Sequence, residues 1–363
     1  MKGTLRGVSG DRLGDVRPTI QENPRLRPVT AIDRVCTGVT TTGDGRVFVS
    51  FPSADGPGVQ VGEIISDGRI VPFPDAAWNE VRDHLDPEGA FVHVNGLRIG
   101  PDGNLWIVDA GSPGPGLPVV PGGPRLIVVD PESATVVRIH DLGPALRPNS
   151  YVDDVRFNGR TAYLTDAGAP GLIVLDLSTG ACRRVLDGHA STVARRPLRA
   201  DGEMLRDAHG RELRIHADQL EVSPDGRYLY YQPASGPLHR IETRCLDDPD
   251  IPPEVVAQQV EPWVDTPTTG GTAIDAAGII YLSDVDRRRI LAIDLDRRIQ
   301  TLVADPRLVW GDAMWLDGTG QLWIPAAQLN RTPGLAGGSS SVDYPVWIYR
   351  MPVDAVPPAI DHA

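Results

Sequence analysis

The stretch LRIGPDGNLWIVD, residues 97–109, contains two alternating runs of β-forming residues on either side of a Pro-Asp-Gly turn. Tight turns between antiparallel strands need a positive φ at a central position, which Gly, Asn and Asp adopt at little cost. The pattern therefore predicts a β-hairpin.

This hairpin unit recurs six times along the chain. The copies cover 39–50, 97–109, 155–166, 220–232, 272–284 and 314–326. Most copies are followed by two further alternating runs, such as RLIVVD (125–130) and ATVVRIHDL (134–142). Each unit then has four antiparallel strands, which predicts an all-β, six-bladed β-propeller rather than a two-sheet sandwich, since a sandwich needs no fixed repeat.

The last copy has only one clear later strand, VWIYRM (346–351). We expect the segment 27–35 to supply the missing strand, so that the two ends of the chain pair and no sheet edge stays open. The whole chain, 1–363, is then one propeller domain. The polar stretch 189–217 interrupts the repeat and predicts a long loop between blades three and four, and such loops often act as lids.

Composition limits the function. The chain has 41% hydrophobic and 23% charged residues and a net charge of −13 with no basic run, so we expect no nucleic-acid partner. No stretch has the length of a membrane span and the first twenty residues lack a signal-peptide core, so we expect a cytoplasmic protein without a membrane partner. The three cysteines have no CxxC spacing, which favours reduced thiols over disulfides or zinc.

Motifs of several enzyme classes are missing from the sequence. It has no GxSxG elbow, GxGxxG loop, P-loop or HExxH helix, and we expect no organic cofactor.

The residues just before the innermost strands of a propeller converge at one mouth of its central tunnel. Counting back from each turn places six residues there: Thr37, Asn95, Asp153, Asp218, Gly270 and Asp312. Carboxylates that share a mouth repel one another unless protons, a cation or hydrogen-bond donors compensate. Asn95, Asp153, Asp218 and Asp312 are therefore candidate ligands of Ca²⁺, which prefers oxygen atoms. The alternative is that each Asp only caps a neighbouring strand.

Four residues are candidates for acid–base catalysis. Asp153 and Asp218 carry carboxylates in the ring, Asp154 stands beside Asp153, and His93 lies two residues before Asn95. A structural role is the alternative for each. Asp109, Asp166 and Asp284 end the second strands of their blades, and we interpret them as structural turn residues.

The same mouth offers candidate ligand-binding residues. Tyr151, Trp310 and Trp315 would form aromatic walls beside Thr37. Packing in the core is the alternative use of these rings. Cys36 is next to Thr37, and an inert buried thiol is the simpler interpretation there.

Three segments carry a family resemblance: RTAYLTDAGAPGLIVLDLSTGACRRVL (160–186), DQLEVSPDGRYLYYQPASGPLHRIET (218–243) and RLVWGDAMWLDGTGQLWIPAAQLNR (307–331). They resemble the yellow and major royal jelly protein family, whose bacterial members are labelled as related to dopachrome tautomerase. The family's propellers hold small ligands, including aromatic amines, in the central channel. The resemblance implies a bacterial isomerase, tautomerase or cyclase of secondary metabolism.

A more distant resemblance leads to the senescence marker protein and gluconolactonase group of calcium-dependent lactonases. Asn95 matches the first Asn of that group's metal site, Asp218 stands in place of the second, and Asp312 matches its Asp. Thr37 occupies the position of the metal-binding Glu, and Asp153 could supply the missing charge.

Three functions stay open on the sequence. The first is an isomerase or cyclase using the Asp residues, the second a calcium-dependent lactone or ester hydrolase, and the third a propeller that binds a small ligand without catalysis. In each, the partner is a small organic metabolite, either aromatic or a lactone.

Overall fold

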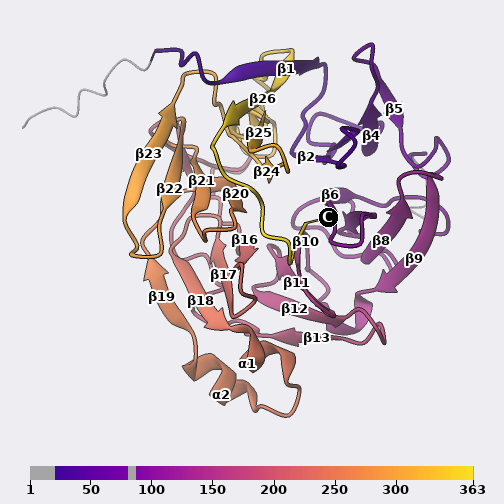
Figure 1. Ribbon diagram of the computed structural model, residues 1–363, viewed down its shortest axis with the longest axis vertical. Helices are drawn as coiled ribbons and strands as arrows, with labels where there is room; N and C mark the ends of the chain where they lie inside the picture. The colour runs from indigo at the N-terminus through magenta and orange to yellow at the C-terminus, as the bar shows by residue number, and fades with distance from the viewer. Residues whose placement is uncertain (1–20, 81–86, 363) are drawn as a thin grey trace, which may run out of the picture.

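A computed structural model describes residues 21–80 and 87–362. Six four-stranded antiparallel sheets stand around a common centre, so the six-bladed propeller is confirmed (Figure 1). Within the described residues, no helix is long and apolar enough to cross a membrane.

The blades follow one another along the chain, each starting with its innermost strand. Blade 1 contains β2 (Gly38–Thr41), β3 (Val47–Ser50), β4 (Val61–Ile64) and β5 (Ile70–Pro72). Blade 2 contains β6 (Val94–Ile99), β7 (Leu105–Asp109), β8 (Arg125–Asp130) and β9 (Thr135–Asp141). Blade 3 contains β10 (Val152–Asn158), β11 (Thr161–Asp166), β12 (Gly171–Asp176) and β13 (Cys182–Val185).

The second half of the ring repeats this order. Blade 4 contains β16 (Ala217–Val222), β17 (Tyr228–Pro233), β18 (Leu238–Glu242) and β19 (Glu261–Val264), with helices α1 (Thr243–Asp247) and α2 (Pro253–Gln258) between its last two strands. Blade 5 contains β20 (Thr269–Ile274), β21 (Ile280–Asp284), β22 (Arg289–Ile293) and β23 (Ile299–Ala304). Blade 6 contains β24 (Trp315–Leu316), β25 (Gln321–Ala326), β26 (Val346–Pro352) and β1 (Arg27–Ile32).

Blade 6 joins the two ends of the chain. Strand β1 pairs antiparallel with β26, from Arg27 opposite Arg350 to Ile32 opposite Val346. The predicted ring closure is therefore confirmed. The buried apolar side chains lie between adjacent blades, so each blade is held by its neighbours on both sides.

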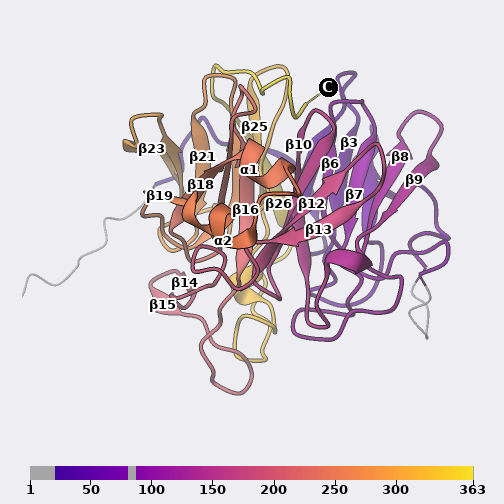
Figure 2. The same ribbon diagram turned by 90° about the horizontal axis from the view of Figure 1, so that it is seen from below.

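The two faces of the ring differ (Figure 2). One face carries the segment 189–217, which includes the short hairpin of β14 (Arg199–Ala200) and β15 (Glu203–Met204). The segment predicted as a loop thus has a small pair of strands of its own. The C-terminal segment runs over the other face and enters the centre of the ring (Figure 1).

The inner strands approach one another closely where they carry glycine. A Cβ on Gly271 would lie 2.3 Å from the carbonyl oxygen of Asp312 in the next blade. We expect Gly271→Ala to lower the free energy of unfolding by about 1–3 kcal/mol, because the backbones must separate. A denaturant melt measures this, with Gly318→Ala as the control, since its Cβ would meet nothing within 4 Å. Equal stability of the two variants would contradict the close approach.

Candidate functional site at the tunnel mouth

The ring residues lie where the inner strands are irregular. The pairing of the first two strands shifts at Val94/Gly96 in blade 2, Val152/Val155 in blade 3 and Ala217/Leu220 in blade 4. A β-bulge adds a residue to one strand and redirects its side chain. These shifts flank Asn95, Asp153 and Asp218.

Asn95 and Asp153 are in contact across two blades. The Asn95 side-chain amide donates to Asp153 Oδ1 at 2.6 Å, and the Tyr151 hydroxyl donates to Asn95 Oδ1 at 3.0 Å. Tyr151 is 7% exposed, and its ring meets the His93 ring edge-on. Tyr151 is therefore a buried residue that positions the Asn95 side chain, and its role as an aromatic wall stays a prediction.

Asp153 and Asp218 form a hydrogen-bonded pair of carboxyl groups. Burial, together with the charge of Asp218, raises the pKa of Asp153 well above its usual range. Burial also raises the pKa of Asp218 to about 7. Two carboxyl groups in contact cannot both ionise readily, so the pair retains a proton near neutral pH. Asp153 has the more strongly raised pKa and is therefore the candidate to hold this proton.

Asp312 faces the same tunnel from blade 6. Its Oδ2 accepts from the Trp310 indole nitrogen at 3.0 Å, and its Oδ1 accepts from the backbone of Ala313 at 2.8 Å. Burial, and next the charge of Asp153, raise the pKa of Asp312 despite these two donors. Trp310 has a φ of +54°, a left-handed conformation that is costly for a bulky residue and that clusters at functional sites.

Two buried polar atoms at the mouth have no hydrogen-bond partner among the described residues: His93 Nε2 and Thr37 Oγ1. Both side chains are 5% exposed. Burial lowers the pKa of His93, so its ring is neutral near pH 7. An unpartnered buried polar atom is costly, and a bound ligand could satisfy it.

Asp154, one of the predicted acid–base candidates, is bound to an arginine. Its Oδ2 accepts from Arg156 at 2.6 Å, and Arg156 also forms a two-pronged pair with Glu221 in blade 4. Thr272 of blade 5 donates to Glu221 at 2.8 Å. This ion-pair network lies next to the ring and engages the Asp154 side chain in a salt bridge with Arg156.

Trp315 is the predicted site residue that the structure places elsewhere. Its indole stacks on His362 with ring centres 4.2 Å apart, lies under Arg98, and donates to Thr41. It therefore faces the opposite end of the tunnel and forms no wall of the mouth. The reason is the strand register, because Trp315 follows Asp312 by three residues.

The turn aspartates bind backbone amides. Asp109 accepts from Val92 and His93, and Asp166 accepts from Tyr151. These carboxylates hold the backbone of the segments that carry His93 and Tyr151. The Cys36 thiol is buried, and burial raises its pKa far above the usual range.

The oxygen atoms of Asn95, Asp153, Asp218 and Asp312 are the kind of ligand that calcium prefers, but their present arrangement does not fit a bound calcium ion. Asn95 turns its amide nitrogen, not its oxygen, toward Asp153, and burial raises the pKa of Asp153 and Asp218, which disfavours the ionised carboxylates that a cation needs. In the part of the chain that the structure describes, no three His, Cys, Asp or Glu side chains are grouped to hold a metal ion. Calcium binding stays a prediction.

Two loops cover part of the mouth. Ile215 packs against Tyr151, and Leu198 and Leu205 pack near Trp310. A second loop, residues 327–345, packs against the segment 189–217. The backbone N–H of Gly337 donates to the Arg206 carbonyl at 3.0 Å. The segment 189–217 thus lies over the site, as expected of a lid.

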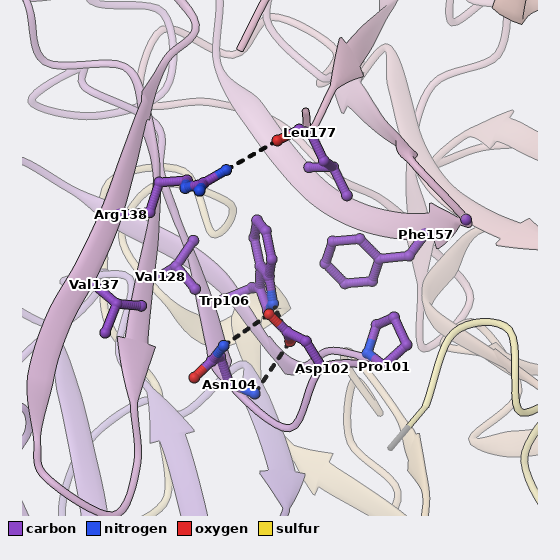
Figure 3. Close-up of a pocket in the computed structure, with 10 residues that line it drawn as sticks. Pro101, Asp102, Asn104, Trp106, Val128, Val137, Arg138, Phe157 and Leu177 are labelled. Carbon is purple, nitrogen blue, oxygen red and sulfur yellow. Dashed lines mark hydrogen bonds between the residues drawn. The ribbon is translucent and has the colours of Figure 1, made fainter. Parts of the chain in front are cut away.

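A separate cleft of about 350 Å³ lies between blades 2 and 3 (Figure 3). Its wall includes Trp106, Phe157 and Val128, with Arg138 bound to the Leu177 carbonyl at its rim. Asp102 accepts from the Trp106 indole at 2.9 Å. None of the mouth carboxylates lines this cleft, so it is separate from the candidate site.

The fold and the mouth define a six-bladed propeller with a buried carboxyl pair in its central tunnel. The major royal jelly protein family model matches residues 92–354, well over half of the chain. The chain belongs to this family, and the predicted resemblance is confirmed. No curated protein matches the chain.

Solved structures share the fold at low sequence identity. A calcium-binding regucalcin from Agrobacterium tumefaciens superposes with a TM-score of 0.56 at 12% identity, covering 95% of this chain and 98% of that one. A gluconolactonase from Xanthomonas campestris superposes with a TM-score of 0.54 at 13% sequence identity, covering 92% of this chain and 97% of that one. A luciferin-regenerating enzyme superposes with a TM-score of 0.57 at 10% sequence identity, covering 92% of this chain and 96% of that one. At these identities the likeness concerns the fold alone.

Proposed function

We propose that the protein is an acid–base enzyme that moves a proton within one small organic molecule, as an isomerase or tautomerase does. The observation that carries the proposal is the contact between the buried Asp153 and Asp218 carboxyl groups, because burial raises the pKa of both into or above the neutral range. Membership of the major royal jelly protein family supports an enzyme-like propeller with a small-molecule site.

The pair can perform both halves of a tautomerisation. The ionised Asp218 carboxylate accepts a proton from one substrate atom, and the protonated Asp153 donates a proton to another. One proton leaves the substrate and one enters it, so the reaction needs no oxidant and no group donor. Tyr151 and Asn95 hold Asp153 in place, and the neutral ring of His93 is a hydrogen-bonding group for the substrate.

A direct test is the infrared carboxyl band of the protein as a function of pH. We expect one protonated-carboxyl band to disappear near pH 7 in the natural protein and to be absent in Asp218→Asn. Loss of dopachrome absorbance in the presence of the protein is the matching activity assay. A pair already fully ionised at pH 5 would contradict the proposal.

Stability should follow the same titration. The pKa of Asp218 is about 7 in the folded protein and about 4 in the unfolded chain, so folding retains a proton between these values. The contribution of Asp218 to stability therefore falls as pH rises from about 4 to 7. We expect Asp218→Asn to flatten this slope in thermal melts, whereas the exposed Asp250→Asn should leave it unchanged.

A calcium-dependent lactone hydrolase is the second candidate, favoured by the match of Asn95 and Asp312 to the distant lactonase pattern. Elemental mass spectrometry of the purified protein, paired with melts in calcium and in chelator, separates the two candidates. One bound calcium per chain would replace the proton-sharing pair by a metal site.

A further inference from the structure

The C-terminal segment enters the tunnel at the end opposite the lid (Figures 1 and 2). Asp361 is 1% exposed and His362 6% exposed, although both belong to a segment without strand or helix. Burying such residues from an irregular segment needs specific partners inside the ring.

Asp361 has cationic and backbone partners from two blades. Its Oδ2 accepts a hydrogen bond from the Arg98 guanidinium, and its Oδ1 accepts from the Phe157 backbone at 2.8 Å. Arg156 lies 3.9 Å from Oδ2. Burial raises the pKa of Asp361 while Arg98 and Arg156 lower it. Because both oxygens accept from N–H donors, the ionised form fits these contacts.

Arg98 depends on this carboxylate. Asp361 is the only carboxylate that Arg98 pairs with in the described part of the chain, and Arg98 Nε has no hydrogen-bond partner there. Burial and the nearby Arg156 both lower the pKa of Arg98. Two guanidinium groups and a backbone N–H that converge on one anion form a typical anion site.

His362 lies beside the Asp361 carboxylate and is also buried inside the ring. Its ring stacks on Trp315, and neither ring nitrogen has a hydrogen-bond partner among the described residues. Burial, Arg98 and Arg156 lower its pKa well below the usual range, so the ring is neutral. The segment therefore presents a carboxylate next to a flat neutral ring.

We propose that this end of the tunnel is a binding site for a carboxylate anion, formed by Arg98, Arg156 and the Phe157 N–H, which the chain fills with its own Asp361. The occupied site closes the tunnel here, so that small molecules reach the carboxyl pair from the lid side. This inference does not depend on the proposed reaction.

Asp361→Ala in the full-length protein tests the proposal. We expect the melting temperature to fall by roughly 5–10 °C, because the buried Arg98 guanidinium loses the carboxylate that it pairs with, whereas Arg156 keeps Asp154 and Glu221. Sodium acetate should then restore much of the loss with saturation in the millimolar range, whereas sodium chloride at equal ionic strength should not. A folded Asp361→Ala protein whose melting temperature is the same in acetate and in chloride would overturn the site.

Two further variants keep the test decisive if Asp361→Ala does not fold. Asp361→Asn keeps the shape of the side chain and an acceptor for the Phe157 N–H but removes the negative charge. Its melting temperature should therefore fall, and acetate should not restore it, because the Asn side chain still fills the site. A melting temperature equal to that of the natural protein would contradict an anion site. His362→Ala is the matched control, because its anion site stays filled and acetate should have no effect.

Discussion

Removal of residues 1–35 should abolish the cooperative melt of this protein. The deletion takes away β1, the only partner of β26 on one side, and leaves blade 6 with an open edge. It also removes Leu26, Ile32 and Val35, each at most 2% exposed. Because each blade is held by both neighbours, an incomplete blade 6 weakens its contacts with blades 1 and 5 as well.

Two point variants on β1 compare a buried side chain with an exposed one on the same strand. Ile32→Asp places a charge in the apolar cluster between blades, and we expect it to destabilise the protein by several kcal/mol. Val29→Asp changes a side chain that is 38% exposed on the same strand, and it should shift stability by no more than about 0.5 kcal/mol. Circular dichroism melts measure both. A truncated protein that melts cooperatively at the natural temperature would show that β1 does not lock the ring.

The fold could be predicted because its signal is local and repeated. Each hairpin carries its own turn residues, and a repeat of known register places equivalent residues at one mouth. Counting back from the turn of each hairpin, with a one-residue adjustment in the shorter third copy, places Asn95, Asp153 and Asp218 at the mouth. Their hydrogen-bonded contact depends on blade order, which the repeat also gives.

A second set of charged residues inside the ring, Arg98, Arg156 and Glu221, was not predicted, although the sequence carries a signal for it. Arg98, Arg156 and Glu221 occupy the same position in LRI, VRF and LEV, each between two apolar residues of an inner strand. Charges at one register position of a buried repeat indicate a second ring inside the tunnel. Trp315 shares this position, which explains why it lies beside Arg98 instead of at the mouth.

The closure by Asp361 could not be predicted from the sequence. Its partners Arg98 and Phe157 are more than two hundred residues away along the chain, and no repeat relates the C-terminal segment to a blade. Such contacts depend on the three-dimensional ring alone. The same holds for the segment 189–217, whose Ile215 packs against the cluster that contains Tyr151 although no repeat relates the two residues.

Replacing Asp153 by Asn should lower the catalysed rate of tautomerisation about 10²–10⁴-fold, the usual contribution of a positioned acid or base. Dopachrome is the first substrate to assay, with kcat and KM measured between pH 5 and 9. Asn keeps the hydrogen-bonding shape but cannot hold the transferable proton. The matched control is Asp275→Asn, a 2%-exposed aspartate that accepts from Tyr281 outside the mouth and should change stability but not rate.

The double variant gives the sharper result. Because Asp153 and Asp218 share one proton, they act as a unit, and the second replacement should cost little beyond the first. If the two groups acted independently, the fold-loss of rate in the double variant would be the product of the fold-losses in the two single variants. We therefore expect Asp153→Asn, Asp218→Asn and the double variant to have similar residual rates, and the limb of the pH profile near 7 to vanish in all three. Full activity in either single variant would remove the carboxyl pair from the reaction, and multiplicative losses would show two separate proton carriers in place of a shared one.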